Sequence, residues 1–559
     1  MRGGIPLLVW SGSISGILFG GLIMVLRVFN GQLEVLAGKL SSAGKCVSCS
    51  PATFEMLNIS IGMALIFLSL FFVASYFHRE EIGTFLKKTY LKLIGSVIAI
   101  LSLRILFISL GRFFLRDELE HVHAAWYIMN SFVPYTEFFE HHHPLLWFAI
   151  TPVLGTIGYS ADALLWLRIA MFLATAGTAF LTYAIARHIT RSPEASLLSV
   201  LFLLSTVMFV DAGIEIRPDV PQVLFGLISV YFLLLFLDRE ETRYIFFAGL
   251  AASVSFLFLQ KSVFLLIAYC MIFLFRLIRG TMSVRSVMYF ILSFSLPLFF
   301  FFVYLILSGA FRDYFLMNWL FNIHRATRIP ALLTFKVSFL QNTLLWLLSL
   351  FSVIFLLGKR EVNGGLKTVG FIGAVLLVVF GFAKNAAKQY CLFPIPPLCV
   401  CSGYTIKWAF EKMRLREPHK LAIIALFLSV PMSILFMTIL PSNQRQLEVI
   451  DYVIKNSQET DLIYDGDVKF NLFRRDIHYF WFYANASEDT INMYNKITQN
   501  SYLEYDVCAL VKTRRPVFIS DFGLDMKRCR LLDLYEETRF GGLYKKRWGG
   551  FAVSGPRAE

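Results

Sequence analysis

The chain has 559 residues, of which 57 % are hydrophobic and 16 % are charged, and its formal net charge at pH 7 is +14. A mean hydropathy of +0.64 excludes an ordinary soluble enzyme, because a soluble fold needs more polar surface. The positive charge does not require a nucleic acid partner, since much of it falls in short loops that would lie beside anionic lipid.

Apolar runs close to the roughly twenty residues that cross a bilayer recur along most of the chain. They predict an all-α polytopic membrane protein with about thirteen transmembrane helices. The first run lacks a small-residue cleavage site, so we expect a retained helix and not a signal peptide. The predicted spans are residues 6–28, 57–77, 90–112, 163–188, 194–211, 219–237, 244–260, 262–279, 286–307, 337–357, 366–383, 390–407 and 420–440.

Short basic loops predict the orientation of these spans, because the loops fall on one side and the positive-inside rule makes that side cytoplasmic. The acid-rich segment after the third span and the C-terminal tail then face the periplasm or an equivalent lumen. Topology does not explain the few cations on that outer side. They are Arg116, Arg217, Lys261, Arg325, Lys384 and Lys388.

Residues 1–88 are predicted to form a two-helix membrane extension with a short cysteine loop. In an oxidising compartment Cys46 could be bridged to Cys49, and Cys508 in the tail to Cys529. A redox or metal role for the first pair is the weaker alternative, because the motif lacks a second half.

The segment after the third span combines acids, histidines and aromatics between apolar runs. On a helix, His121 lies one turn from Asp117 and Glu118, so the three side chains share a face. Helix capping would explain one or two of these acids. It does not explain the further acids and histidines some twenty residues on, which favour a functional site.

Tyr135 lies at the start of this second part of the segment, which goes on to Glu140 and three consecutive histidines, His141, His142 and His143. Glu140, His141 and His142 are candidate ligands of a divalent metal; histidine and carboxylate ligands suit zinc or manganese, and magnesium is a further possibility. Hydrogen bonding of these side chains to substrate or to a lipid phosphate is the alternative.

Three more polar clusters fall at outer helix ends: Glu215 to Asp219 around Arg217, Gln260 with Lys261, and Lys384 to Tyr390. Arg217 and Asp219 could form a structural ion pair, and each lysine could snorkel to the interface. Arginine also matches phosphate oxygens in a forked geometry. Because all these clusters meet on one face of the membrane, we expect a shared site for an anionic ligand.

From Pro441 onward the apolar runs stop. Gln446 to Lys455 is predicted to be an amphipathic helix, Asp461 to Tyr464 the start of a strand, and Val517 to Ser520 another strand. Residues 441–559 are therefore predicted to form a small extracytoplasmic α/β domain, behind a membrane domain of residues 89–440.

Several motifs resemble the first external loop of the family C membrane glycosyltransferases that use polyprenyl-phosphate sugars. They are the Asp117-Glu118 pair at the end of an early helix, Ala125-Trp126-Tyr127-Ile128, Pro134-Tyr135 followed by Phe138-Phe139-Glu140-His141-His142, and Pro144-Leu145-Leu146-Trp147. Arg217-Pro218-Asp219 and Lys388-Gln389-Tyr390 also match that family in relative position. Its members include protein O-mannosyltransferases and the lipid A aminoarabinose transferase.

The resemblance implies that Asp117 is the catalytic base, that Glu118 supports it or orients the acceptor, and that Asp219 is a second active-site acid. His143 stands where many members have a lysine before proline, so this chain departs from the family there. The residues expected to contact substrate or phosphate are Arg217, Lys261, His143, Lys388, Tyr390 and Tyr135.

The implied function is transfer of a sugar, with inversion, from a polyprenyl-phosphate donor to a hydroxyl of a lipid, glycan or protein. A bacterial inner membrane is the expected location, with the site extracytoplasmic. One alternative is a secondary transporter or flippase for an anionic lipid or solute, although transporters place critical charges near the bilayer midplane. Another is a polymerase or ligase of surface polysaccharide.

Overall fold

The computed structural model describes residues 79–547 apart from residues 325–329, 360, 383–386, 438–440, 467–468, 481–486 and 500–505. The spans predicted at residues 6–28 and 57–77, and the Cys46–Cys49 loop, lie outside the described residues. Helix α19 (Glu417–Met437) belongs to one compact unit with residues 1–87, and residues 88–415 and 441–559 form a second unit.

Seven helices among the described residues are long and apolar enough to cross a bilayer. They are Lys88–Gly111 of α3 (Arg79–Gly111), α6 (Asp162–Thr190), α9 (Asp219–Arg239), η1 (Gln260–Ser262) with α11 (Val263–Ile278), α12 (Val284–Leu307), α17 (Gly364–Gly381) and α19.

Two further pairs of helices qualify only if each bent pair counts as one span. These are α7 (Pro193–Ser205) with α8 (Val207–Gly213), bent by 69°, and α15 (Ala331–Gln341) with α16 (Thr343–Gly358), bent by 110°. The predicted number of thirteen is therefore not confirmed. Helix α10 (Thr242–Phe258) has 17 residues, and α18 (Ile395–Lys412) carries three charges near its end.

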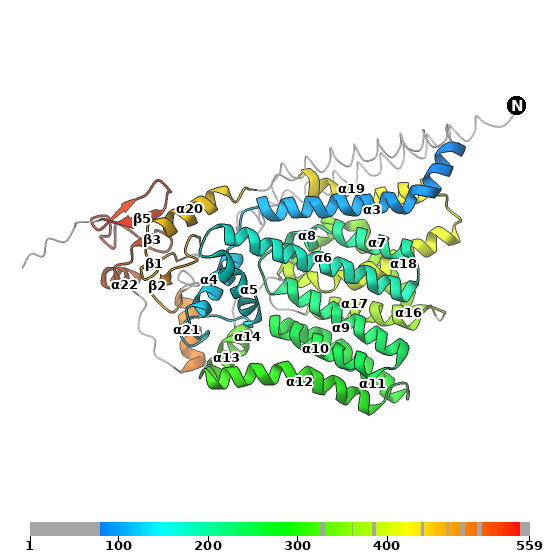
Figure 1. Cartoon of the computed structure of the whole chain (residues 1–559), viewed down its shortest axis with the longest axis horizontal. Coiled ribbons are helices and arrows are strands. Elements are labelled where there is room, and N and C mark those ends of the chain that lie inside the picture. The colour runs from blue at the N-terminus through cyan, green and yellow to red at the C-terminus, as the bar shows by residue number, and fades with distance from the viewer. Residues whose placement is uncertain are drawn as a thin grey trace, which may run out of the picture. The chain divides into compact units, whose positions relative to one another are not determined.

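Small residues allow the membrane helices to pack closely. Helices α6, α9, α10 and α12 lie side by side, and α7 packs on α18 (Figure 1). A Cβ added to Gly403 of α18 would lie 2.5 Å from the carbonyl oxygen of Ala195 in α7. A Cβ on Gly249 of α10 would lie 2.5 Å from the carbonyl oxygen of Phe290 in α12. Such close backbone approach is how helices associate where water supplies no driving force.

One asparagine joins the two helix bends. The Oδ1 of Asn342, at the bend between α15 and α16, accepts from the backbone N–H of Val207 at 3.0 Å, and its Nδ2 donates to the carbonyl of Ser205 at 3.2 Å. Both partners flank the break between α7 and α8. The backbone groups that this break frees are thus satisfied inside the protein, as the bilayer interior requires.

At one end of the spans, shorter elements surround the acid-rich segment. Helix α4 (Arg116–Met129) contacts α5 (Leu145–Ile157), and the loop of residues 130–144 joins them. This loop contacts α13 (Phe311–Phe315), the π-helix η2 (Leu316–Phe321) and α14 (Asn322–His324), through an Asn322 Nδ2 to His141 carbonyl bond of 2.8 Å among others. The 3-10 helix η3 (Lys388–Leu392) packs on α8.

Residues 441–547 contain a five-stranded mixed sheet in the order β2-β1-β3-β5-β4. The predicted helix and both predicted strands are present, as α20 (Gln444–Lys455), β1 (Leu462–Tyr464) and β3 (Phe518–Ser520). The other elements are β2 (Arg475–Asp476), α21 (Ser487–Thr498), α22 (Val507–Arg514), β4 (Tyr535–Glu537) and β5 (Leu543–Lys546).

Strand β1 is parallel to β2 and β3, and β5 is antiparallel to β3 and β4. The structure joins Cys508 to Cys529. That this region is an independent domain remains a prediction, as does the division of the chain into three domains.

Candidate functional site

The predicted base pairs with an arginine in the resting structure. The Nη1 of Arg217 donates a short hydrogen bond to Asp117 Oδ2, and its Nε lies 3.4 Å from Asp219 Oδ2. The side chain of Asp117 is 41 % exposed, whereas the side chains of Asp219 and Arg217 are buried. Burial acts to raise the pKa of Asp117, but the charge and hydrogen bond of Arg217 outweigh it and lower that pKa to about 2.

Lys261 extends this arrangement from η1. Its Nζ lies 3.1 Å from Asp219 Oδ1 and 3.7 Å from the ring centre of Tyr390 in η3, a cation–π contact. The structure therefore brings together five residues that the sequence analysis selected from four distant stretches.

A second set of ion pairs adjoins the first through Glu215, whose Oε2 lies 3.9 Å from Arg217 Nε. Lys388 Nζ lies 2.5 Å from Asp211 Oδ2 and 2.6 Å from Glu215 Oε1. Arg112 pairs with the same two acids. We call the combined set the ionic network; it consists of Arg112, Asp117, Asp211, Glu215, Arg217, Asp219, Lys261 and Lys388.

Glu118 pairs with a different arginine from Asp117. Both of its oxygens accept from Arg168 of α6, at 2.7 and 2.9 Å, and neither residue is exposed. Glu118 also accepts from the backbone N–H of Leu115, which caps α4, and of Ile216, which fixes the loop before Arg217. This geometry favours the predicted supporting role over an acceptor contact.

Arg168 also closes the end of α3. Its Nη1 donates to the carbonyls of Ser109 and Arg112 at 2.7 Å each, and its Nη2 donates to that of Phe113 at 2.9 Å. Carbonyls at a helix C-terminus lack intrahelical partners. One buried guanidinium therefore holds α3, α4 and α6 at the border of the network.

Four residues of the next part of α4 and its following loop form what we call the histidine–carboxylate group. One ligand atom from each of Glu120, Glu140, His141 and His142 lies within 4.8 Å of the others. His142 Nδ1 is 3.3 Å from Glu140 Oε2 and 3.7 Å from Glu120 Oε1. Burial raises the pKa of Glu140 to about 8, which a cation beside it would reverse. These donors fit a divalent metal of the zinc type.

Two of the residues expected to touch substrate are used elsewhere. His143 is buried; its Nδ1 lies 2.8 Å from the Phe256 carbonyl oxygen and its Nε2 lies 3.0 Å from the Tyr314 hydroxyl. Both ring nitrogens therefore have protein partners, so the predicted phosphate contact of His143 is not supported. Tyr135 is also buried and donates its hydroxyl to the His142 carbonyl at 2.7 Å, so it shapes the loop.

Residues 470–480, which we call the covering segment, pack against α4 and the loop of residues 130–144. Asp476 Oδ2 lies 2.8 Å from His123 Nε2, and the Leu472 carbonyl oxygen lies 2.9 Å from His123 Nδ1. The Tyr479 carbonyl accepts from the Phe139 backbone N–H at 3.0 Å. The side chains of His123 and Asp476 are buried in this contact.

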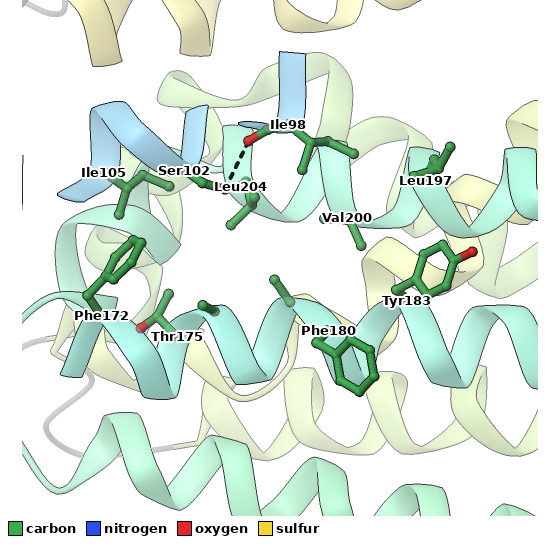
Figure 2. Close-up of a pocket in the computed structure, with 12 residues that line it drawn as sticks. Ile98, Ser102, Ile105, Phe172, Thr175, Phe180, Tyr183, Leu197, Val200 and Leu204 are labelled. Atoms are coloured by element: carbon green, nitrogen blue, oxygen red, sulfur yellow. Dashed lines mark hydrogen bonds between the residues drawn. The ribbon is translucent and has the colours of Figure 1, made fainter. Parts of the chain in front are cut away.

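An apolar groove of about 260 Å³ lies between α3, α6 and α7 (Figure 2). Phe172 and Tyr183 of α6 lie at its opposite ends, and no charged side chain lines it. Beside Phe172, Thr175 donates its hydroxyl to the carbonyl of Gly213, which lies two residues after Asp211 in α8. This end of the groove therefore lies near α8, whose Asp211 belongs to the ionic network.

The sequence analysis missed Arg112, Glu120, Arg168 and Asp211 as members of the site. Arg168 lies inside a predicted span, where an ionisable residue usually has a function or a partner. Arg112 and Asp211 each end a predicted span. Among the outer cations, Arg325 and Lys384 lie outside the described residues.

The sequence model of the dolichyl-phosphate-mannose-protein mannosyltransferase family matches residues 142–306. An uncharacterized protein of Aquifex aeolicus (strain VF5) is 25 % identical over 257 residues, which is 44 % of this chain and 50 % of that protein. The chain thus spans about half the length of the curated relative it matches.

Solved structures support the same fold. ArnT from Cupriavidus metallidurans bound to undecaprenyl phosphate has a TM-score of 0.57 at 13 % identity, covering 78 % of this chain and 94 % of ArnT. The apo state of that protein has a TM-score of 0.51 at 11 % identity, covering 70 % and 85 %. The predicted resemblance is confirmed: this is an integral membrane protein with the fold of the family C glycosyltransferases.

Proposed function

We propose that this chain transfers a sugar from a polyprenyl-phosphate donor to an acceptor hydroxyl. The observation that carries the proposal is the ionic network itself, in which an exposed carboxylate, Asp117, lies beside the buried cation Arg217. Lys261 and Lys388 supply further cations from other elements. The similar fold of ArnT, solved with undecaprenyl phosphate, supports the choice of donor class.

In the proposed reaction Asp117 removes the proton from the acceptor hydroxyl as its oxygen attacks the anomeric carbon. The leaving group is the phosphate of the lipid, and Arg217, Lys261 and Lys388 stabilise its charge. A single displacement of this kind inverts the anomeric configuration. General base catalysis of this type contributes about a hundred- to ten-thousand-fold in rate.

The resting pair between Asp117 and Arg217 must loosen for this chemistry. With its pKa held at about 2, Asp117 is a weak base. A donor phosphate that binds the Arg217 guanidinium competes with the carboxylate for it, and the pKa of Asp117 then rises. Asp219 pairs with Arg217 and Lys261 and holds them in place while the phosphate replaces Asp117 on Arg217. We therefore assign Asp219 a positioning role.

The hydrocarbon tail of such a donor needs apolar surface at membrane depth. The groove between α3, α6 and α7 offers it (Figure 2). We place the ionic network and the covering segment on the extracytoplasmic side, because the basic loops of the sequence lie at the opposite helix ends. A bacterial inner membrane is the location that we propose.

The test is transfer by purified protein from a defined polyprenyl-phosphate sugar to an acceptor mixture. Asp117→Asn should lower the rate at least about a hundredfold. Asp162→Asn is the matched control, since Asp162 is an exposed acid in the first turn of α6 and should transfer normally. Normal transfer by Asp117→Asn would refute the base assignment. Uptake of the lipid by sealed vesicles without any glycoside product would instead identify a transporter.

A further inference from the structure

His121 is buried between the two halves of the site. It lies one turn along α4 from Asp117, on the same helix face. The charges of Arg217, Asp117 and Asp219 all act on its ring. On the other side, its ring centre is 5.0 Å from that of His142 in the histidine–carboxylate group. His121 thus links the ionic network to that group.

A tryptophan fixes the tautomer of this ring. The Nε1 of Trp147 donates to Nδ1 of His121 at 3.1 Å, and both side chains are buried. An indole N–H can only donate, so Nδ1 must present its lone pair. The neutral imidazole then carries its proton on Nε2.

This proton has no acceptor in the resting structure. His121 Nε2 is buried, and it has no hydrogen-bond partner among the residues that the structure describes. Buried donors without an acceptor destabilise a fold and are rare in native proteins. A donor of this kind beside Asp117 indicates an acceptor that arrives with a ligand.

We propose that the Nε2–H of His121 donates a hydrogen bond to an oxygen of the lipid-linked donor, and that Trp147 holds the imidazole in the tautomer that can do so. The inference rests on the proposed function. The acceptor is either a phosphate oxygen or a sugar hydroxyl. Access requires the Asp117–Arg217 pair to open, which a phosphate competing for Arg217 would cause.

A neutral donor suits this position better than a cation or a base. Because the indole N–H of Trp147 donates to Nδ1, that nitrogen carries no proton and the ring is neutral while the bond is in place. It therefore binds an oxygen without adding charge to a network whose acids and cations are already paired.

The first test compares two substitutions of His121 in the full-length protein. Glutamine retains an N–H donor, whereas leucine keeps volume without one. With the polyprenyl-phosphate sugar, His121→Leu should lower kcat/KM at least about tenfold, and His121→Gln should recover a substantial part of the loss. The control is His324→Leu, because His324 is an exposed histidine on α14. A folded His121→Leu protein that transfers normally would overturn the proposal.

Inhibition of transfer by polyprenyl phosphate that lacks the sugar identifies which oxygen of the donor accepts the hydrogen bond from His121. If His121 binds the phosphate, His121→Leu should weaken this inhibition by the same factor as kcat/KM. If it binds the sugar, inhibition stays unchanged while KM for the complete donor rises. Transfer by the wild-type protein establishes the proposed function separately, so failure of that function is distinguishable from failure of this inference.

Trp147→Phe tests the tautomer lock even if the leucine variant does not fold. Without the indole donor, the neutral ring can carry its proton on Nδ1 instead of Nε2, and KM for the complete donor should rise. A merely structural Trp147 would lower thermal stability and leave the KM of the folded protein unchanged. That outcome would overturn the assigned role of Trp147 and the fixed Nε2–H with it.

Discussion

Adjacent acids on α4 have different environments, and their partners explain the difference. Asp117 is exposed and shares its one arginine with Asp219, so a ligand can compete for that arginine. Glu118 is sealed against Arg168, which has no other acid partner among the described residues. The Asp117–Arg217 pair can therefore open during a reaction. The Glu118–Arg168 pair has a structural role and stays closed.

Glu118→Gln should therefore lower the stability of the protein more than it lowers the rate of sugar transfer. Removing one partner of a buried ion pair leaves an uncompensated charge, here on Arg168, at a cost of about 3–5 kcal/mol. We expect a lower midpoint of thermal unfolding in detergent. Glu137→Gln is the control, because Glu137 is exposed. Combining Glu118→Gln with Arg168→Gln should cost less than the two single changes together, and simple additivity would contradict the pairing.

Asp117, Arg217, Asp219 and Lys261 stood out in the sequence because each interrupts or ends an apolar run. Of their pairs, only that of Arg217 with Asp219, two residues apart, could be suggested from the sequence. The pair of Asp117 with Arg217 joins residues a hundred positions apart and that of Lys261 with Asp219 residues 42 apart, which no local pattern encodes. Glu120 escaped notice because it follows Glu118 on a helix whose acids already had a capping explanation.

The histidine–carboxylate group should bind zinc. Its ligand atoms come from α4 and the loop of residues 130–144, and their mutual distances allow one ion to contact all four after small shifts. Elemental analysis of protein purified without chelator should find about one zinc per chain. The double change of Glu140→Gln and His142→Ala should abolish it. His123→Gln, also on a buried histidine of α4, should leave it in place, and retained zinc in the double variant would exclude this site.

At the scale of elements, the two helix breaks are coupled by Asn342. A break in a membrane helix frees backbone groups that lipid cannot satisfy. Here a single side chain at one break satisfies both Val207 N–H and the Ser205 carbonyl at the other. The bend of α7 and α8 directs α8 toward η3, which carries Lys388.

Asn342→Leu should loosen this junction. It would leave the Val207 N–H and the Ser205 carbonyl without their partners, at about 1–3 kcal/mol for each buried group. We expect faster thermal inactivation and weaker donor binding, because α8 also carries Asp211. Gln341→Leu is the neighbouring control, since the Oε1 of Gln341 makes no hydrogen bond among the described residues. Equal stability of the two variants would argue against the junction.

Hydropathy predicted helices correctly at every candidate span within the described residues, but it could not predict these bends. An apolar run of eighteen to twenty-one residues has the same composition whether it is straight or broken. The break at Thr206 has no proline or glycine to mark it, and the side chain that satisfies its backbone groups comes from a segment more than a hundred residues away. The predicted number of thirteen spans is not confirmed, because two of the predicted spans lie outside the described residues and seven to nine qualify within them.

At the scale of the whole molecule, the C-terminal region of residues 441–547 contacts the rest of the second unit at α4. The covering segment reaches the helix that carries Asp117 and His121, and both ring nitrogens of His123 face oxygen acceptors within it. Asp476 and the Leu472 carbonyl each lie within hydrogen-bond distance of one ring nitrogen of His123. Asn471 Nδ2 adds a 3.0 Å bond to the same Asp476 oxygen.

This contact should couple the stability of the covering segment to the geometry of the site. In a double-mutant cycle of His123→Gln and Asp476→Asn, we expect a coupling free energy of about 0.5–3 kcal/mol in thermal unfolding. Each single change should increase amide hydrogen exchange in residues 470–480 and raise KM for the lipid-linked donor, because the loop of residues 130–144 loses the surface against which it packs. Lys512→Gln, on an exposed residue of α22 outside the covering segment, should do neither. If exchange rises while KM stays unchanged, the covering segment contributes stability alone and takes no part in holding the site.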